Sequence, residues 1–203
     1  MDSIDKLTEF FKEFPGIGER QARRFVYFLM SRNGDFTGNL AKLITELKKE
    51  ISQCKDCYRY FAGKGIQDSV CDICRSVTTD KSLLMVLEKD SDLESVKKSR
   101  VYAGKYFVLG GLVPIVEKTT NTRVRIPELI KSIEQNNEIK EIILAFSLNS
   151  HGDHTDSYVR NQIKEITQKN NIKISSLGRG LSTGTELEYS DNETLKNALK
   201  NRQ

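Results

Sequence analysis

The first fifty residues repeat hydrophobic side chains at helical spacing. These side chains recur every third or fourth position in three segments, at about 2–14, 19–31 and 39–53, which is the period of one helix face. Asp2 or Ser3 is suited to cap the first segment, and the sequence PGIG interrupts the pattern after it. We therefore predict three helices, of which a tight turn joins the first two. The apolar positions are Ile4, Leu7, Phe10, Phe11 and Phe14, then Ala22, Phe25, Val26 and Leu29, then Leu40, Leu43, Ile44, Leu47 and Ile51.

From residue 80 onward the hydrophobic residues form continuous runs instead. The runs are SLLMVLE (82–88), YFVLGG (106–111), EIILAF (141–146) and IKISSLG (172–178), and helical patterns lie at about 91–99, 127–137, 155–169 and 192–201. Pro127 stands at a favoured position for proline, in the first turn of its helix. Strands that alternate with helices favour a parallel sheet covered on both faces. We therefore predict an α/β domain of strands buried on both faces, with functional residues at their carboxyl ends.

Composition describes a mildly basic chain without a membrane or export segment. The 203 residues include 32 Lys and Arg against 28 Asp and Glu, a formal charge of +4 that permits a polyanionic partner. No run approaches the roughly 18 to 20 apolar residues that span a bilayer. The N-terminal sequence MDSIDKLTEFFKEF lacks the apolar centre of a signal peptide. We expect a cytoplasmic protein, in which cysteines are more often thiolate ligands than disulfides.

Four cysteines form two closely spaced pairs. CKDC and CDIC, with thirteen residues between them, place the four at Cys54, Cys57, Cys71 and Cys74. Each pair presents two sulfurs to one ion, and two pairs complete a closed tetrahedron, which is typical of structural rather than catalytic zinc. Free thiols and a redox pair are the alternatives. We predict one structural zinc ion in a small module at 54–76.

The sequence FPGIGERQARRF, at 14–25, is suited to bind an anion. Gly16 and Gly18 allow a tight turn, which exposes amide groups at the start of the next helix, where the helix dipole favours a negative charge. Arg20, Arg23 and Arg24 follow, and Arg20 and Arg24 lie on one face. The alternative is an ordinary helical hairpin with solvated arginines. The turn resembles the helix-hairpin-helix of DNA-repair proteins, so we predict contact with DNA phosphates, without sequence preference.

Two further stretches carry candidate chemistry. His151 and His154 flank Asp153 directly after a predicted strand and are a possible second metal site, although loop histidines are more often solvated, and Asp153 or Thr155 is suited to cap the next helix. The sequence GRGLSTGTE, which includes Arg179, has glycines that would cradle a phosphate, but its spacing fits no Walker A loop. For this stretch we predict a turn or a subunit contact.

The order of these parts is that of a known family. A helix-hairpin-helix at 1–53, a four-cysteine module at 54–76 and an α/β domain at 80–178 together resemble the bacterial recombination mediator RecR. The motifs that carry the resemblance are FPGIGERQARRFVYFL, the cysteine pairs, VLE (86–88), YFVLGG, EIILAF and RGLSTGTELEYSDNETLKNAL (179–199). The resemblance covers almost the whole chain and implies a Toprim domain, a Rossmann-like fold with a mostly parallel sheet, and a C-terminal loop and helix at 179–203.

The resemblance also implies a function without catalysis. Proteins of this family assemble into dimers or tetrameric rings that clamp DNA at the nucleoid. They work with RecO and RecF to load recombinase at single-stranded gaps and at junctions of single-stranded and duplex DNA. By resemblance, Arg20 and Arg24 contact DNA, the four cysteines bind zinc, and Glu88 and Asp153 form the acidic pocket linked to RecO.

The chain departs from the family at several positions. His151 stands where the family has an acidic residue, Ser182 and Thr185 replace a usual proline and glycine, and LVPIVEKTTNTRVRIP replaces a Pro- and Gly-rich loop. A catalytic Toprim domain holds magnesium with oxygen ligands, and imidazole suits zinc or a transition metal better. We therefore predict no catalytic residues. A Toprim nuclease, primase or topoisomerase is the alternative, and a zinc-stabilised adaptor that binds chiefly proteins is a third possibility.

Overall fold

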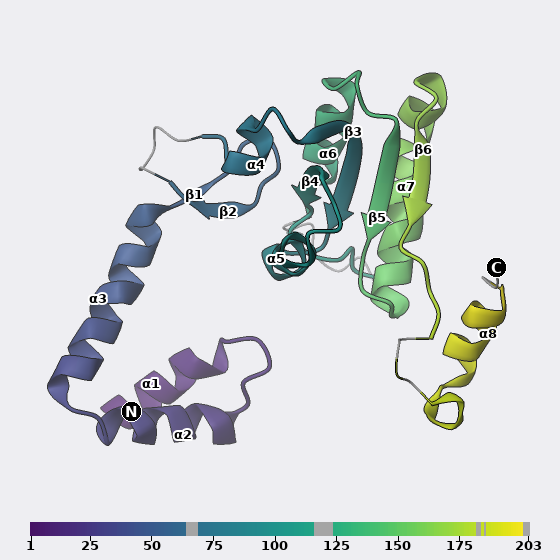
Figure 1. Cartoon of the computed structure of the whole chain (residues 1–203). Coiled ribbons are helices and arrows are strands. Elements are labelled where there is room, and N and C mark those ends of the chain that lie inside the picture. Colours follow the sequence, from purple (N-terminus) through teal and green to yellow (C-terminus); the bar gives the residue numbers. More distant parts are fainter. Residues whose placement is uncertain (64–68, 116–123, 182–183, 185, 201–203) are drawn as a thin grey trace. The chain divides into compact units, whose positions relative to one another are not determined.

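The computed structural model in Figure 1 describes residues 1–63, 69–115, 124–181, 184 and 186–200. The chain divides into two compact units, Met1–Ser52 and Gln53–Gln203. Within the described residues, no helix combines the length and the apolar character needed to cross a membrane. Ser182 and Thr185, and residues 116–123 of the loop that departs from the family, lie outside the described residues.

The N-terminal unit begins with two packed helices, α1 (Ser3–Lys12) and α2 (Glu19–Met30). The carboxylate of Asp2 accepts a hydrogen bond from the Asp5 amide at 2.8 Å, which caps α1 as predicted. Between the helices the rings of Phe11 and Phe25 meet edge to face, with centroids 5.6 Å apart. The prediction of two helices joined by a turn is confirmed.

The third helix, α3 (Gly34–Glu50), differs from its predicted bounds of 39–53. It begins earlier because the Asn33 side chain accepts a hydrogen bond from the Phe36 amide at 3.0 Å. It ends earlier because Ile51–Gln53 form the short strand β1, which pairs with β2 (Tyr60–Ala62). The predicted hydrophobic side of the helix exists, but it is open to solvent in the single chain. The exposed fractions are 64% for Leu43, 62% for Ile44 and 59% for Leu47.

A four-stranded parallel sheet forms the centre of the second unit, in the order β4-β3-β5-β6. The strands are β3 (Asp80–Leu87), β4 (Gly104–Val108), β5 (Glu141–Ala145) and β6 (Lys173–Ser176). The predicted α/β domain is confirmed. The prediction that every strand is buried on both faces is wrong for β6, whose two terminal residues are exposed, whereas β4 at the opposite edge is largely buried.

Helices cover the two faces of this sheet unequally. The larger core joins the strands to α6 (Ile126–Glu134) and α7 (Ser150–Lys169) and includes Phe107, Leu129 and Ile163. The smaller core lies on the other face against α5 (Asp90–Ser99) and includes Leu93. Hydrophobic burial on both faces therefore fixes the central strands and the edge at which they end.

Three short helices complete the described fold. They are α4 (Asp72–Arg75), the 3-10 helix η1 (Leu187–Tyr189) and α8 (Asn192–Lys200). The sequence pattern predicted α8 but neither α4 nor η1. Pro127 occupies the first turn of α6, as expected. The start of α7 at Ser150, rather than near residue 155, places both histidines inside a helix.

Candidate functional site

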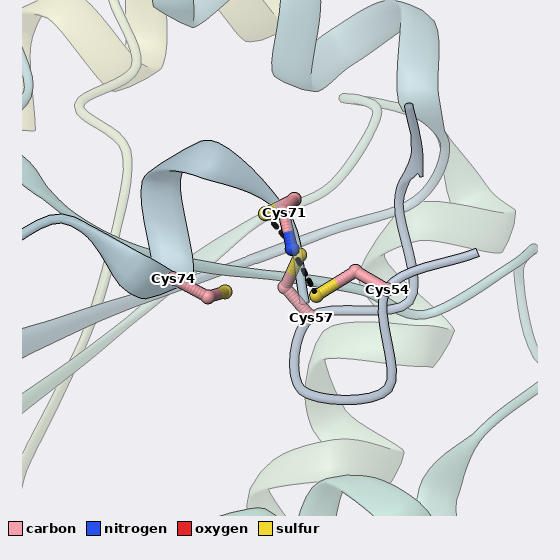
Figure 2. Close-up of side chains that lie close together, drawn as sticks. All are labelled: Cys54, Cys57, Cys71 and Cys74. Atoms are coloured by element: carbon pink, nitrogen blue, oxygen red, sulfur yellow. Dashed lines mark hydrogen bonds between the residues drawn. The ribbon is translucent and has the colours of Figure 1, made fainter. Parts of the chain in front are cut away.

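The four cysteines converge although the two pairs lie far apart in sequence (Figure 2). The first pair, Cys54 and Cys57, lies in a tight turn in which the Cys54 amide donates to the Arg59 carbonyl at 2.9 Å. The second pair stands at the start of α4, with Cys71 as its N-cap and Cys74 within it. All four sulfurs lie within 4.8 Å of one another. Cys74 is half-buried and the other three are buried.

The donor set fits a tetrahedral metal ion. The sulfurs of Cys57 and Cys71 are 3.6 Å apart, and the four thiols are not joined as disulfides. Two ligands of a tetrahedral ion with a Zn–S distance of about 2.3 Å would be about 3.8 Å apart, close to this separation. Hydrogen bonds from the thiols of Cys57 and Cys71 lower the pKa of Cys54, while those from the neighbouring thiols raise the pKa of Cys57 and Cys74. The four cysteines can therefore hold a metal ion.

The turn between α1 and α2 leaves the start of α2 without a side-chain cap. Gly16 has a φ of +77°, in the left-handed region that favours glycine. The Ile17 amide donates to the Phe14 carbonyl at 3.1 Å and closes the turn. Gly18 is the N-cap of α2 and has no side chain to accept from the first amides, and the Ala22 amide is bonded to the Gly18 carbonyl at 2.9 Å. The exposed turn therefore presents amide groups at the positive end of a helix dipole.

The three arginines of α2 differ in their surroundings, although all are exposed. Arg23 lies 3.6 Å from a carboxylate oxygen of Asp5 and 3.5 Å from one of Glu19. Arg24 makes one long hydrogen bond, of 3.5 Å, to Gln21, and Arg20 has no ion pair with another described residue. Arg20 and Arg24 are therefore the cations of α2 that are not held by a carboxylate in the described chain.

The acidic positions Glu88 and Asp153 lie at the carboxyl edge of the sheet, and each is bonded to another side chain. Glu88 directly follows β3, and its carboxylate accepts a hydrogen bond from the Ser147 hydroxyl at 2.7 Å. Asp153 lies in the first turn of α7 and forms an ion pair with Arg179. Arg179 and Ser147 were not predicted to touch this site, because only the folded chain brings such distant positions together.

The histidines occupy the first turn of α7 rather than a loop. The prediction that Asp153 or Thr155 caps this helix is wrong, because the Asn149 side chain accepts from the Gly152 amide at 2.9 Å. His151 is exposed and His154 is half-buried. Among the described residues, only the four cysteines bring three or more potential metal ligands within 4.8 Å. The structure therefore does not gather the two histidines, Asp153 and Glu88 into such a set.

Arg179 also bears on the predicted use of the GRGLSTGTE stretch. Its guanidinium contacts Asp153 at the carboxyl edge of the sheet, so the described part of the stretch is attached to its own chain through this residue. Part of the stretch lies outside the described residues. The subunit contact expected of this stretch stays a prediction.

Comparisons with known proteins agree with this arrangement. The family described as Toprim domain matches residues 83–177, and the family described as RecR, C-terminal matches residues 180–203. A Recombination protein RecR from Bifidobacterium longum subsp. infantis is 34% identical over 200 residues, which cover 98% of this chain and 95% of the relative. Those from Limosilactobacillus reuteri and Staphylococcus aureus strain Newman are 32% and 33% identical over 201 residues, which cover 99% of this chain and 96% of each relative. Since this identity extends over nearly the full length of both partners, the chain belongs to the RecR family of recombination proteins.

Proposed function

We propose that this protein is a non-enzymatic DNA clamp in recombinational repair. In this role it would act with RecO and RecF at the nucleoid to load recombinase at single-stranded gaps. The observation that carries the proposal is the uncapped start of α2 at Gly18, beside the exposed cations Arg20 and Arg24, in a chain of the RecR family. Amides and guanidinium groups placed together in this way recognise the phosphates of a nucleic acid.

The hairpin would hold the DNA backbone and leave the bases unread. The amides at the start of α2 would donate to phosphate oxygens, while Arg20 and Arg24 would neutralise the charge of one phosphate or its neighbours. Arg23 would serve to hold α2 against α1, because Asp5 and Glu19 flank it. Contacts to phosphates alone predict little sequence preference and an affinity that falls steeply with salt.

Charge reversal at Arg24 tests the hairpin directly. We expect Arg24→Glu to weaken binding to gapped DNA about tenfold near 0.1 M salt. The slope of log affinity against log salt should fall by about 0.9 for each phosphate that the variant no longer neutralises. Fluorescence anisotropy with labelled DNA over a salt series measures both quantities. The matched control is Lys98→Glu, which reverses an exposed charge on α5 in the second unit. This variant should change neither the affinity nor the salt slope. An unchanged slope in Arg24→Glu would remove the hairpin from the interface.

The metal of the cysteine cluster is proposed to be one structural zinc ion. Cys54, Cys57, Cys71 and Cys74 would supply all four ligands and leave no open coordination position for a substrate. When bound, zinc would contribute on the order of 10 kcal/mol of folding free energy to this short segment. The four cysteines would bind the ion and hold the segment in its fold, and they would take no part in a reaction.

Glu88 and Asp153 are proposed to bind a protein partner rather than catalytic magnesium. The bonds from Ser147 and Arg179 engage both carboxylates, and His151 stands in place of a third acidic residue. A partner such as RecO would reach this edge with basic side chains that replace Arg179 at Asp153. The geometry therefore supports a binding role for the Toprim domain.

A cleavage assay separates this role from a Toprim enzyme. We expect no cleavage of plasmid or single-stranded DNA when Mg²⁺ or Mn²⁺ is added, and the same result for Asp153→Ala. Cleavage by the unaltered protein that disappears in Asp153→Ala would contradict the non-enzymatic proposal. A known Mg²⁺-dependent nuclease in parallel reactions establishes that the assay detects turnover.

A homo-oligomer, either a dimer or a tetrameric ring, completes the proposal. The hydrophobic side of α3 supports it, because Leu43, Ile44 and Leu47 are each about three-fifths exposed in the single chain. Contiguous apolar surface of this kind is typical of protein interfaces. A ring or clamp would then surround the DNA that the hairpins hold.

A further inference from the structure

Arg59 is a buried charged residue beside the cysteine cluster. It follows Cys57 by two positions, and only 6% of its surface is exposed. Its backbone belongs to the metal-binding turn, since its carbonyl accepts from the Cys54 amide at 2.9 Å. The side chain leaves the turn and donates from Nη2 to Asp72 Oδ1 at 2.6 Å. Because Asp72 directly follows Cys71, this ion pair joins the two cysteine pairs.

The same network reaches α5 of the Toprim domain. Nη1 of Arg59 lies 3.9 Å from Glu94 Oε1, and Lys97 Nζ lies 3.6 Å from the second oxygen of Asp72. The backbone amide of Tyr60 donates to Asp90 Oδ1 at 2.7 Å. Residues 90, 94 and 97 are spaced by four and three positions, so they share one face of the helix. Three polar contacts therefore attach the cysteine module to a single stripe of α5.

The buried guanidinium is not explained by its bonds alone. Its Nε and Nη1 atoms are buried without a hydrogen-bond partner among the described residues. Burying donors in this way costs free energy of folding, so the charge at this position calls for another explanation. Four thiolates around a divalent cation carry a net charge of −2. Arg59 supplies a buried cation from the turn that carries Cys54 and Cys57, and its carboxylate partners are Asp72, next to Cys71, and Glu94 of α5.

The position of α5 bears on the acidic edge of the sheet. The helix begins at Asp90, two residues after Glu88, and Asp90 is the residue bonded to the Tyr60 amide. We infer that Arg59 is a positioning residue that couples metal occupancy of the cysteine cluster to the placement of α5, and through it to Glu88. Loss of the metal would relax the turn that holds Arg59 and loosen α5. This coupling is independent of the proposed DNA contact.

A second attachment makes the inference specific to α5. The Val108 amide of β4 donates to the Cys57 carbonyl at 2.8 Å, and the Tyr58 ring packs against Phe107 with centroids 5.3 Å apart. These interactions do not involve the Arg59 side chain. The cysteine module therefore stays attached to the sheet when Arg59 is replaced, while its ion pair with Glu94 of α5 is lost and Asp72 loses the guanidinium that holds it.

Hydrogen exchange measured by mass spectrometry tests this coupling in the full-length protein loaded with Zn²⁺. Removal of zinc by a chelator is expected to speed exchange in α5 about tenfold in the unaltered protein, while α6 on the opposite face of the sheet changes little. Arg59→Met is expected to show the faster α5 exchange with zinc still bound, and chelation should add little more. Native mass spectrometry of the same samples reports the zinc count. Lys98→Met removes a charge from α5 outside the network and should behave like the unaltered protein.

Two outcomes would overturn the inference. One is protection of α5 in Arg59→Met equal to that of the unaltered protein, and the other is equal acceleration of α5 and α6 on chelation, which indicates global unfolding. Asp90→Ala combined with Glu94→Ala removes both acceptors on the α5 side and leaves the metal-binding turn untouched. This double variant should reproduce the Arg59→Met result, so the inference is still tested if Arg59→Met fails to fold.

Discussion

Single side chains decide what the carboxyl edge of the sheet can do. Glu88 bonds the Ser147 hydroxyl, and Asp153 pairs with Arg179 from the segment after β6. A magnesium ion or a basic partner must therefore compete with groups of the same chain for these oxygens. Because Arg179 already offers a cation to Asp153, a partner arginine can exchange for it with little change in local charge.

Gly152 sets the distance between α7 and the end of β5. A Cβ at this position would overlap the carbonyl oxygen of Ser147, the residue whose hydroxyl bonds Glu88. We expect Gly152→Ala to lower the free energy of unfolding by about 1–3 kcal/mol, because backbone rather than a flexible side chain must move. Urea denaturation followed by circular dichroism measures the change.

A matched glycine provides the control for this substitution. A Cβ at Gly178 meets no atom within 4 Å, so Gly178→Ala should leave the unfolding midpoint nearly unchanged. If the two variants are equally stable, the close approach of Gly152 to Ser147 does not fix the start of α7.

At the scale of helices and strands, the hydrophobic pattern predicted the elements whose formation depends on burial. The strands β3, β4 and β5 follow the apolar runs closely, because their side chains enter a core. Helices α1 and α2 follow the apolar period as well, although only Thr8, Ala22 and Val26 are buried in them. The starts of α3 and α7 were predicted too late. Each begins at an asparagine, Asn33 or Asn149, whose side chain caps the first turn, and these caps stand before polar residues that carry no hydrophobic period.

The candidate site was predictable only in part from the sequence. The spacing of the cysteine pairs is a local property, so it identified all four members of the cluster. Arg59 and Arg179 were missed as partners of Asp72 and Asp153, because those pairings join positions 13 and 26 residues apart and depend on how the elements pack. No periodicity in the sequence reports such pairings.

For the whole molecule, the exposed side of α3 predicts assembly. We expect Ile44→Glu combined with Leu47→Glu to shift the protein toward monomer, because burial of four charges at an apolar interface is strongly unfavourable when two copies meet. Native mass spectrometry over a concentration series measures the subunit number.

An exposed apolar residue elsewhere gives the control for the assembly test. Val77 is 94% exposed in the second unit, and Val77→Glu should leave the subunit number unchanged. Assembly of the α3 double variant that matches the unaltered protein would place the subunit interface on another surface.

The open side of α3 has a consequence for how the protein withstands heat and dilution. When association buries the hydrophobic side of α3, a higher protein concentration stabilises the folded form. The melting temperature then rises with protein concentration. A cell that makes few copies would hold a less robust population than one that makes many. The number of copies in the cell would then set the fraction of the protein that is folded at a given temperature.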